Sequence, residues 1–113
     1  MARETTVIAR VQVEGLHCWP GAFADVIFLR YPHRHIFHIE ARAAVQHADR
    51  QIEIIDLGHQ LRAWLREQYG EPADFGTLSC EMIADKLMDA FDLQMCTVLE
   101  DGENGAMVRE WAS

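Results

Sequence analysis

Three histidines are the residues of this chain whose type and spacing could do chemistry. His33 and His35 lie two residues apart in a stretch with a strand-like pattern, and His17 lies on an earlier one. Side chains at i and i+2 of a β-strand point to the same face, so a neighbouring strand can supply a third imidazole. Three neutral imidazoles with an open fourth position are typical of a catalytic zinc site. The spacing therefore predicts a three-histidine metal site; an exposed histidine pair on an edge strand is the alternative.

Two strands are predicted to position these histidines. Residues 5–14 alternate between apolar and polar side chains, which predicts a strand that Gly15 ends or bends. Residues 18–32 contain prolines and a glycine around an apolar run, which predicts a long loop with or without a short strand inside it. The second strand is expected from about His33 to His47, and residues 51–55 are expected to continue it after a bulge.

The pattern changes to a helical period after residue 55. Apolar residues from Leu57 to Leu65 form one stripe, and Gly70 with Pro72 stops this helix. A second helix is predicted to start after Ser79, which is a good N-cap residue. Residues 95–99 and 106–111 then predict two strands joined by the turn sequence of residues 101–105.

The predicted order ββααββ indicates an α+β fold. Two hairpins that flank two helices should form an antiparallel sheet with both helices packed on one face. The chain has 113 residues and no linker-like segment, so we expect a single domain over residues 1–113. A domain of this size can bury only part of its apolar surface by itself, so we expect the chain to self-associate.

Composition narrows the function classes. The net charge of −8 and the scattered arginines argue against a nucleic-acid partner. The three cysteines have unrelated spacings, which indicates reduced thiols rather than disulfides or a CxxC zinc motif. No apolar stretch approaches the roughly 20 residues that cross a membrane. Residues 1–6 contain no apolar run typical of a signal peptide, so we expect a cytoplasmic protein without a membrane partner.

Several short motifs together resemble a known family. They are a histidine ending the first strand, an HxH motif opening the second, Ile-Asp-Leu before the first helix, Ser-Cys-Glu-Met-Ile-Ala opening the second helix, and a glutamate closing the third strand. This pattern resembles the 6-pyruvoyltetrahydropterin synthase and 6-carboxytetrahydropterin synthase family over nearly the whole chain. The resemblance implies the T-fold, or tunnelling fold, in which subunits assemble into an oligomeric barrel with sites between neighbouring chains.

The resemblance also implies roles for individual residues. His17, His33 and His35 match the three zinc-binding histidines of the family, with His-Arg-His standing where the family usually has His-Gly-His. Glu100 matches the acid that anchors the amide and amino edge of a pterin or purine-like ring. A carboxylate suits this role because it accepts two hydrogen bonds side by side. Without the resemblance, Glu100 would be interpreted as a turn residue.

The chain departs from the family at the catalytic residues. The family's cysteine a few residues before the HxH motif is absent, and so is its Asp-His pair between the two helices. Cys18 is a candidate nucleophile or base if it faces the site, and a buried small residue otherwise. His59 is a candidate base, or a solvated surface histidine. Cys80 shares the first turn of the second helix with Glu81, which is a candidate ligand-binding acid or a partner of the helix N-terminus.

Two functions remain open on this basis. The first is a zinc-dependent protein of the tetrahydropterin synthase type that binds a dihydroneopterin-like ligand at a subunit interface and performs lyase or isomerase chemistry on its side chain. The second is a non-catalytic protein that binds zinc and a pterin or purine-like ligand. Trp19, close to His17 in the sequence, is a candidate to stack on such a ring, or a core or interface residue. A structural oligomer without a metal is a third interpretation.

Overall fold

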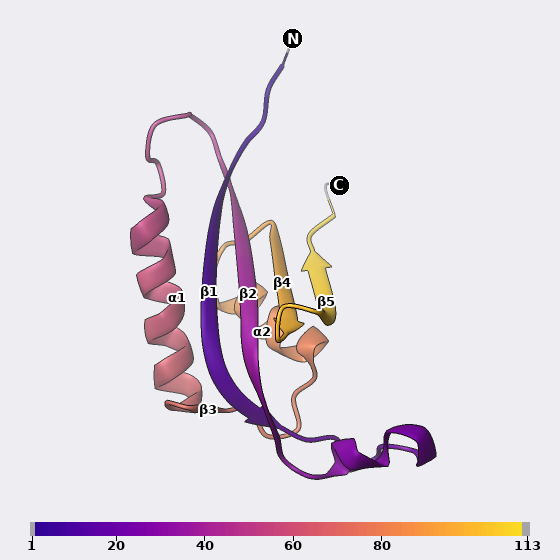
Figure 1. Cartoon of the computed structure of the whole chain (residues 1–113). Coiled ribbons are helices and arrows are strands. Elements are labelled where there is room, and N and C mark those ends of the chain that lie inside the picture. The colour runs from indigo at the N-terminus through magenta and orange to yellow at the C-terminus, as the bar shows by residue number, and fades with distance from the viewer. Residues whose placement is uncertain (1, 112–113) are drawn as a thin grey trace.

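The computed structural model describes residues 2–111; Met1, Ala112 and Ser113 of the predicted domain lie outside the described residues. The elements in chain order are β1 (Thr5–His17), the 3₁₀ segment η1 (Ala24–Arg30), β2 (His33–Val45), α1 (Ile54–Tyr69), β3 (Ala73–Asp74), α2 (Cys80–Ala90), β4 (Met95–Glu100) and β5 (Asn104–Arg109). They form an α+β fold with a five-stranded sheet in the order β3-β1-β2-β4-β5. Figure 1 shows the two long strands β1 and β2 at the centre of the sheet.

One hydrophobic core lies between the sheet and both helices. α1 packs against β1 and β3, and α2 packs against β4 and β5 (Figure 1). The alternation predicted from the sequence is confirmed, because Val11 and Phe37 face the core while Gln12 and His38 face away. The helices contribute the predicted stripes, whose buried members are Leu57, Leu61, Leu65, Ile83 and Leu87. Both helices therefore cover the same face of the sheet, as expected.

The structure corrects three predictions about the elements. The sheet is mixed rather than antiparallel, because β3 pairs in parallel with β1 and is too short to produce an alternating pattern. The loop between β1 and β2 contains the 3₁₀ segment η1 rather than a short strand. Residues 51–55 do not continue β2: α1 already begins at Ile54, where the Glu53 side chain accepts hydrogen bonds from the backbone N–H groups of Ile55 and Asp56.

Gly15 does not end the first strand; it allows β1 to continue to His17. A Cβ atom at Gly15 would lie 2.7 Å from Cε2 of Phe75 and 3.1 Å from Cε2 of Phe37. These rings pack directly on the strand backbone because glycine has no side chain there. The three additional residues of β1 bring His17 into register with His33.

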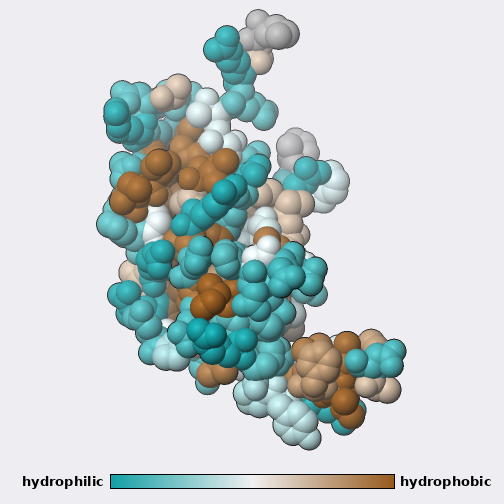
Figure 2. Space-filling view, in the orientation of Figure 1, coloured by the Kyte–Doolittle hydropathy of each residue, from teal (hydrophilic) through white to brown (hydrophobic). Residues whose placement is uncertain are grey.

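Residues 18–32, which we call the arm, project from the end of the sheet where β1 ends and β2 begins (Figure 1). The Trp19 N–H donates to the Leu29 carbonyl at 2.6 Å, and Nε of Arg30 donates to the Ala22 carbonyl at 2.7 Å. Apolar side chains nevertheless cover the outside of the arm, as Figure 2 shows. The most exposed are Phe23, Ile27, Phe28 and Tyr31. Among the described residues, no helix has the length and apolar character needed to cross a membrane.

Candidate metal centre

The three predicted histidines lie together at one end of the β1–β2 hairpin. His17 is directly opposite His33 in the antiparallel register, and His35 is opposite Gly15. All three side chains therefore point to the core-facing side of the sheet. Their ring centroids are 4.6 Å (His17–His33), 5.0 Å (His33–His35) and 5.5 Å (His17–His35) apart. The fully buried ring of Phe37 lies below His17 and His35 and gives the site an apolar floor.

Each histidine uses Nδ1 to bind an oxygen atom of the protein. His17 Nδ1–H donates to the carbonyl of Leu78 at 2.9 Å, and His33 Nδ1–H donates to the carbonyl of Tyr31 at 2.9 Å. Nδ1 of His35 lies 2.7 Å from Oδ2, a carboxylate oxygen of Asp101. An acceptor at each Nδ1 fixes the tautomer that carries its lone pair on Nε2. This arrangement is typical of metal-ligating histidines, whose second nitrogen is oriented by an outer hydrogen bond.

Asp101 is held in place by β2 as well as by His35. Its other carboxylate oxygen accepts from the Ile36 N–H at 2.9 Å, and its own N–H donates to the Ile36 carbonyl at 2.7 Å. The hydrogen bond from His35, followed by that from Ile36, lowers the pKa of the Asp101 carboxyl below its ordinary value. Asp101 is therefore a fixed anionic acceptor that orients the His35 ring.

The free Nε2 atoms face the carboxylate of Glu100 at the end of β4. Its two oxygens lie 3.0 Å from His17 Nε2 and 3.2 Å from His35 Nε2. With Nδ1 protonated, Nε2 of a neutral ring is an acceptor and so is the carboxylate oxygen, and both Nε2 atoms are buried without a hydrogen-bond partner. A cation between these atoms, either a proton or a metal ion, is needed to satisfy both sides.

A metal ion satisfies this arrangement better than protons do. The three histidines and Glu100 each offer one ligand atom, and these atoms lie within 4.8 Å of one another. A second proton on every ring would place three positive charges at ring separations of 4.6 to 5.5 Å. One divalent ion accepts all the lone pairs at once. Imidazole with a carboxylate suits zinc and also other divalent transition metals.

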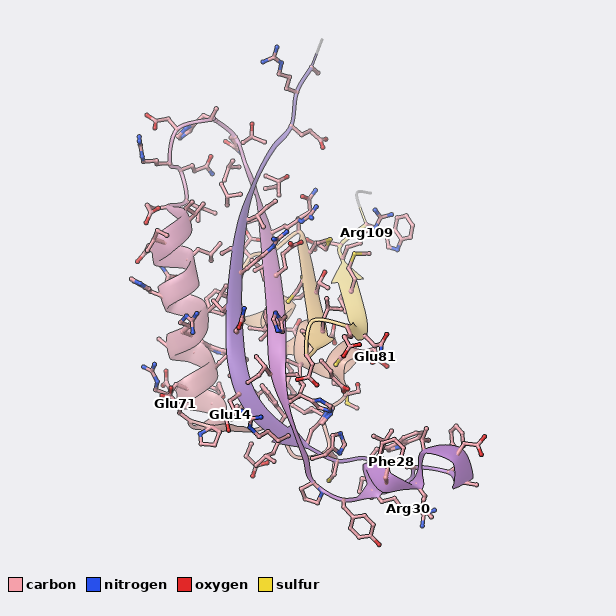
Figure 3. The ribbon with its side chains drawn as sticks, in the orientation of Figure 1. Glu14, Phe28, Arg30, Glu71, Glu81 and Arg109 are labelled. Carbon is pink, nitrogen blue, oxygen red and sulfur yellow. The ribbon has the colours of Figure 1, made fainter. Side chains whose placement is uncertain are left out.

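A cavity of about 490 Å³ opens beside the histidine cluster. The arm forms one wall, and the start of α2 with the start of β5 forms the other. The lining residues are His17, Cys18, Trp19, Leu29, His33, Thr77, Leu78, Ser79, Cys80, Glu81, Met82, Glu100, Asn104 and Gly105. Trp19, which is 45% exposed, offers an aromatic surface, and Glu81 lies at the start of α2 near the β4–β5 turn (Figure 3). The cavity is large enough for a bicyclic heterocycle.

Of the candidate catalytic residues, Cys18 lines the cavity and His59 does not. Cys18 is half-buried and lines the cavity directly after His17. His59 is an exposed residue of α1 and is not among the residues that line this cavity. Cys80 also lines the cavity, but burial, followed by the nearby charge of Glu100, raises the pKa of its thiol to about 12. The helix N-terminus therefore does not activate Cys80, and this side chain remains a thiol.

Sequence reasoning missed the groups that orient the histidines. The sequence places Asp101 only in the turn that directly follows Glu100, where the structure gives it a positive φ of 55°. That signal is ambiguous, because aspartate tolerates such turn conformations readily. The carbonyls of Leu78 and Tyr31 carry no sequence signal, since every residue has a carbonyl. The predicted ligand His17, by contrast, is brought together with His33 and His35.

The comparisons with known proteins add no family assignment. No protein-family model matches the chain, and no curated protein matches it. The functional interpretation therefore rests on the geometry of this site and on the sequence motifs.

Proposed function

We propose that this protein binds a divalent transition metal through His17, His33 and His35, and we expect this metal to be zinc. We also propose that a pterin-like or purine-like ligand binds in the adjoining cavity. The observation that carries the proposal is the hydrogen-bond pattern of the cluster: all three Nδ1 atoms lie within hydrogen-bonding distance of protein oxygens, which leaves the Nε2 atom of each ring for a metal ion. The histidines can offer ligand atoms that lie within 4.8 Å of one another. The motifs and the core-facing histidines support a T-fold protein of the tetrahydropterin synthase type.

The cavity supports a planar, unphosphorylated ligand. Trp19 supplies an aromatic face, while Glu81 and Asn104 supply polar groups for the edge of a ring. The described residues that line the cavity include two glutamates and no lysine or arginine. A triphosphate would gain no cationic side chain from these residues, so we expect a pterin without phosphates to bind more tightly.

Binding of 6-hydroxymethylpterin to the zinc-loaded protein tests this proposal. Fluorescence titration should show saturable binding that disappears when a chelator removes the metal and returns when zinc is restored. The Trp19→Leu variant should bind more weakly because it loses the aromatic face, whereas Trp64→Leu, outside the cavity, should match the parent protein. Equal binding with and without metal would contradict a ligand site that depends on the metal.

Catalysis is a second candidate function, and the position of Cys18 favours it. A bound metal would polarise a side-chain hydroxyl or carbonyl of the ligand and acidify the neighbouring C–H. Cys18, which lines the same cavity as His17, is the thiol placed to exchange a proton with that carbon. Turnover of dihydroneopterin that is lost in Cys18→Ala and kept in Cys96→Ala would establish a lyase or isomerase. Metal-dependent binding without turnover would leave a binding protein.

We also propose that the chain forms a homo-oligomer. β5 lies at one edge of the sheet, and no other described strand pairs with its outer backbone groups, so a strand of another chain can pair with them. The apolar outside of the arm is a second surface that association would cover. Sedimentation velocity should therefore give a mass of several chains, and the mass of one chain at micromolar concentration would contradict the proposal.

A further inference from the structure

Glu100 is the carboxylate that lies against the histidine cluster, and its position differs from that of a ring anchor. Its oxygens lie 3.0 Å and 3.2 Å from two imidazole Nε2 atoms. In a tetrahedral zinc site with metal–ligand distances of about 2.0 to 2.1 Å, neighbouring ligand atoms are about 3.4 Å apart. Each of these two distances, measured from a different oxygen of the carboxylate, is close to one edge of such a tetrahedron, so Glu100 can supply a ligand atom through either oxygen.

We propose that Glu100 is the fourth protein ligand of the metal and that the Cys80 thiol is the hydrogen-bond donor that positions it. This inference rests on the proposed metal site and changes its character. The set becomes three imidazoles and one carboxylate, rather than three imidazoles with an open position. A ligand in the cavity then reaches the metal by adding as a fifth ligand or by displacing Glu100.

The thiol of Cys80 lies beside the carboxylate of Glu100. Its Sγ lies 3.7 Å from Oε1 of Glu100, within hydrogen-bonding distance for sulfur. The Cys80 thiol has a hydrogen to donate and the Glu100 carboxylate can only accept, so the hydrogen bond runs from Cys80 to Glu100. A thiolate at this position would instead repel Glu100. Cys80 is therefore a positioning residue that acts through Glu100, not a nucleophile.

Glu81 provides a matched control because it lines the same cavity but is not a member of the ligand cluster. Figure 3 shows Glu81 at the start of α2. Glu100→Gln and Glu81→Gln each remove one carboxylate from the lining of this cavity. Only the loss of Glu100 changes the coordination of the metal if the proposal is correct.

In the experiment, the protein is loaded with Co²⁺ and its visible spectrum is recorded, and its Co²⁺ affinity is measured by competition with a chromophoric chelator. Glu100→Gln should lower the affinity by more than about 100-fold, since even outer hydrogen-bond partners of ligands contribute about 10- to 100-fold. It should also shift the Co²⁺ absorption bands, because one anionic ligand is lost. Glu81→Gln should change neither quantity.

Cys80 variants test the positioning role with the same readouts. Cys80→Ala should lower the Co²⁺ affinity by about tenfold and shift the bands slightly, and Cys80→Ser should restore both because a hydroxyl also donates. Circular dichroism should be recorded for each variant to check that it is folded. An unchanged spectrum and affinity in a folded Glu100→Gln variant would overturn the inference while leaving the metal site in place. A parent protein that binds no Co²⁺ or zinc would overturn both.

Discussion

His35 donates a hydrogen bond from Nδ1–H to Oδ2 of Asp101 across 2.7 Å, and this contact joins the metal cluster to the turn between β4 and β5. Asp101 in turn accepts the Ile36 N–H, so its carboxylate is fixed by the strand that carries His35. An orienting acceptor of this kind raises the basicity of the ligating nitrogen and fixes the ring. The turn is therefore part of the metal centre.

Loss of this acceptor should weaken metal binding without removing a ligand. We expect Asp101→Ala to lower the zinc affinity by about 10- to 100-fold, measured by competition with a chromophoric chelator. Asp101→Asn should lose less, because its carbonyl oxygen still accepts from His35. Glu103→Ala, in the same turn, is the control and should bind zinc normally. Equal affinities for Asp101→Ala and the parent protein would contradict the orienting role.

Two glycines should respond in opposite directions to the same substitution. Gly15→Ala should lower the free energy of unfolding by about 1 to 3 kcal/mol, because the new Cβ would lie 2.7 Å from the ring of Phe75. Gly58→Ala should raise it by about 0.5 to 1 kcal/mol, since Gly58 lies inside α1 and the nearest atom, in Val11, is 4.0 Å away. Urea unfolding of both variants measures the difference. A tolerated Gly15→Ala would refute the close packing at the end of β1.

Thiol reactivity should separate the cysteines. Burial raises the pKa of both Cys80 and Cys96 to about 12, whereas Cys18 is only half-buried. In the native metal-free protein at pH 8, a disulfide reagent should therefore modify one thiol per chain quickly, and Cys18→Ala should abolish this fast phase. Fast modification of two or three thiols in folded protein would contradict this assignment.

The same buried thiols make the fold sensitive to alkali. In the unfolded chain they ionise near their ordinary pKa of 9.0, whereas in the native state they keep their protons until about pH 12. The unfolded state therefore binds fewer protons in this window, and the free energy of unfolding should fall as the pH rises above 9. Cys96→Ala should reduce the slope of this fall, measured by urea unfolding at a series of pH values. An unchanged slope would contradict a buried native thiol.

Acid should destabilise the fold through hydrogen-bonded carboxylates. A hydrogen bond from Arg34 lowers the pKa of Glu14, and a hydrogen bond from the Ile55 N–H lowers the pKa of Glu53. Their contribution is present above the ordinary pKa of 4.5 and is lost as the pH falls through the lowered native values. Combined Glu14→Gln and Glu53→Gln substitution should flatten the fall in unfolding free energy below pH 4.5. Glu67→Gln, on the exposed face of α1, should not.

Long elements with strong periodicity could be predicted from the sequence. The alternation around Val11 identified the buried face of β1, and the leucine stripe identified α1. For β2, the period of two correctly placed His35 and Phe37 on one face, without indicating which face is buried. β3 and η1 could not be found in this way, because a two-residue strand has no period and η1 buries none of its residues. Tertiary contacts with Leu16, rather than local sequence, hold residues 73–75 at the edge of the sheet.

In the candidate site, too, some features follow from local sequence spacing and others depend on how the strands pair. The spacing of His33 and His35 was sufficient to place both side chains on one face, since strands have a period of two. The contribution of His17 depended on the register between β1 and β2, in which Gly15 lies against the rings of Phe75 and Phe37. The approach of Glu100 to the histidines depends on the register of β4, which no local pattern encodes.

Metal content per chain is the most direct test of the account. The protein, the ligand variant His35→Ala and the control His38→Ala should be purified with zinc, dialysed and analysed by atomic emission. His38 lies on the same strand as His35 but on the opposite face of the sheet, so its loss leaves the cluster intact. The account predicts about one zinc ion per chain in the parent protein and in His38→Ala, and a substantial loss in folded His35→Ala. Absence of metal from the parent protein, or full retention in His35→Ala, would contradict the three-histidine centre.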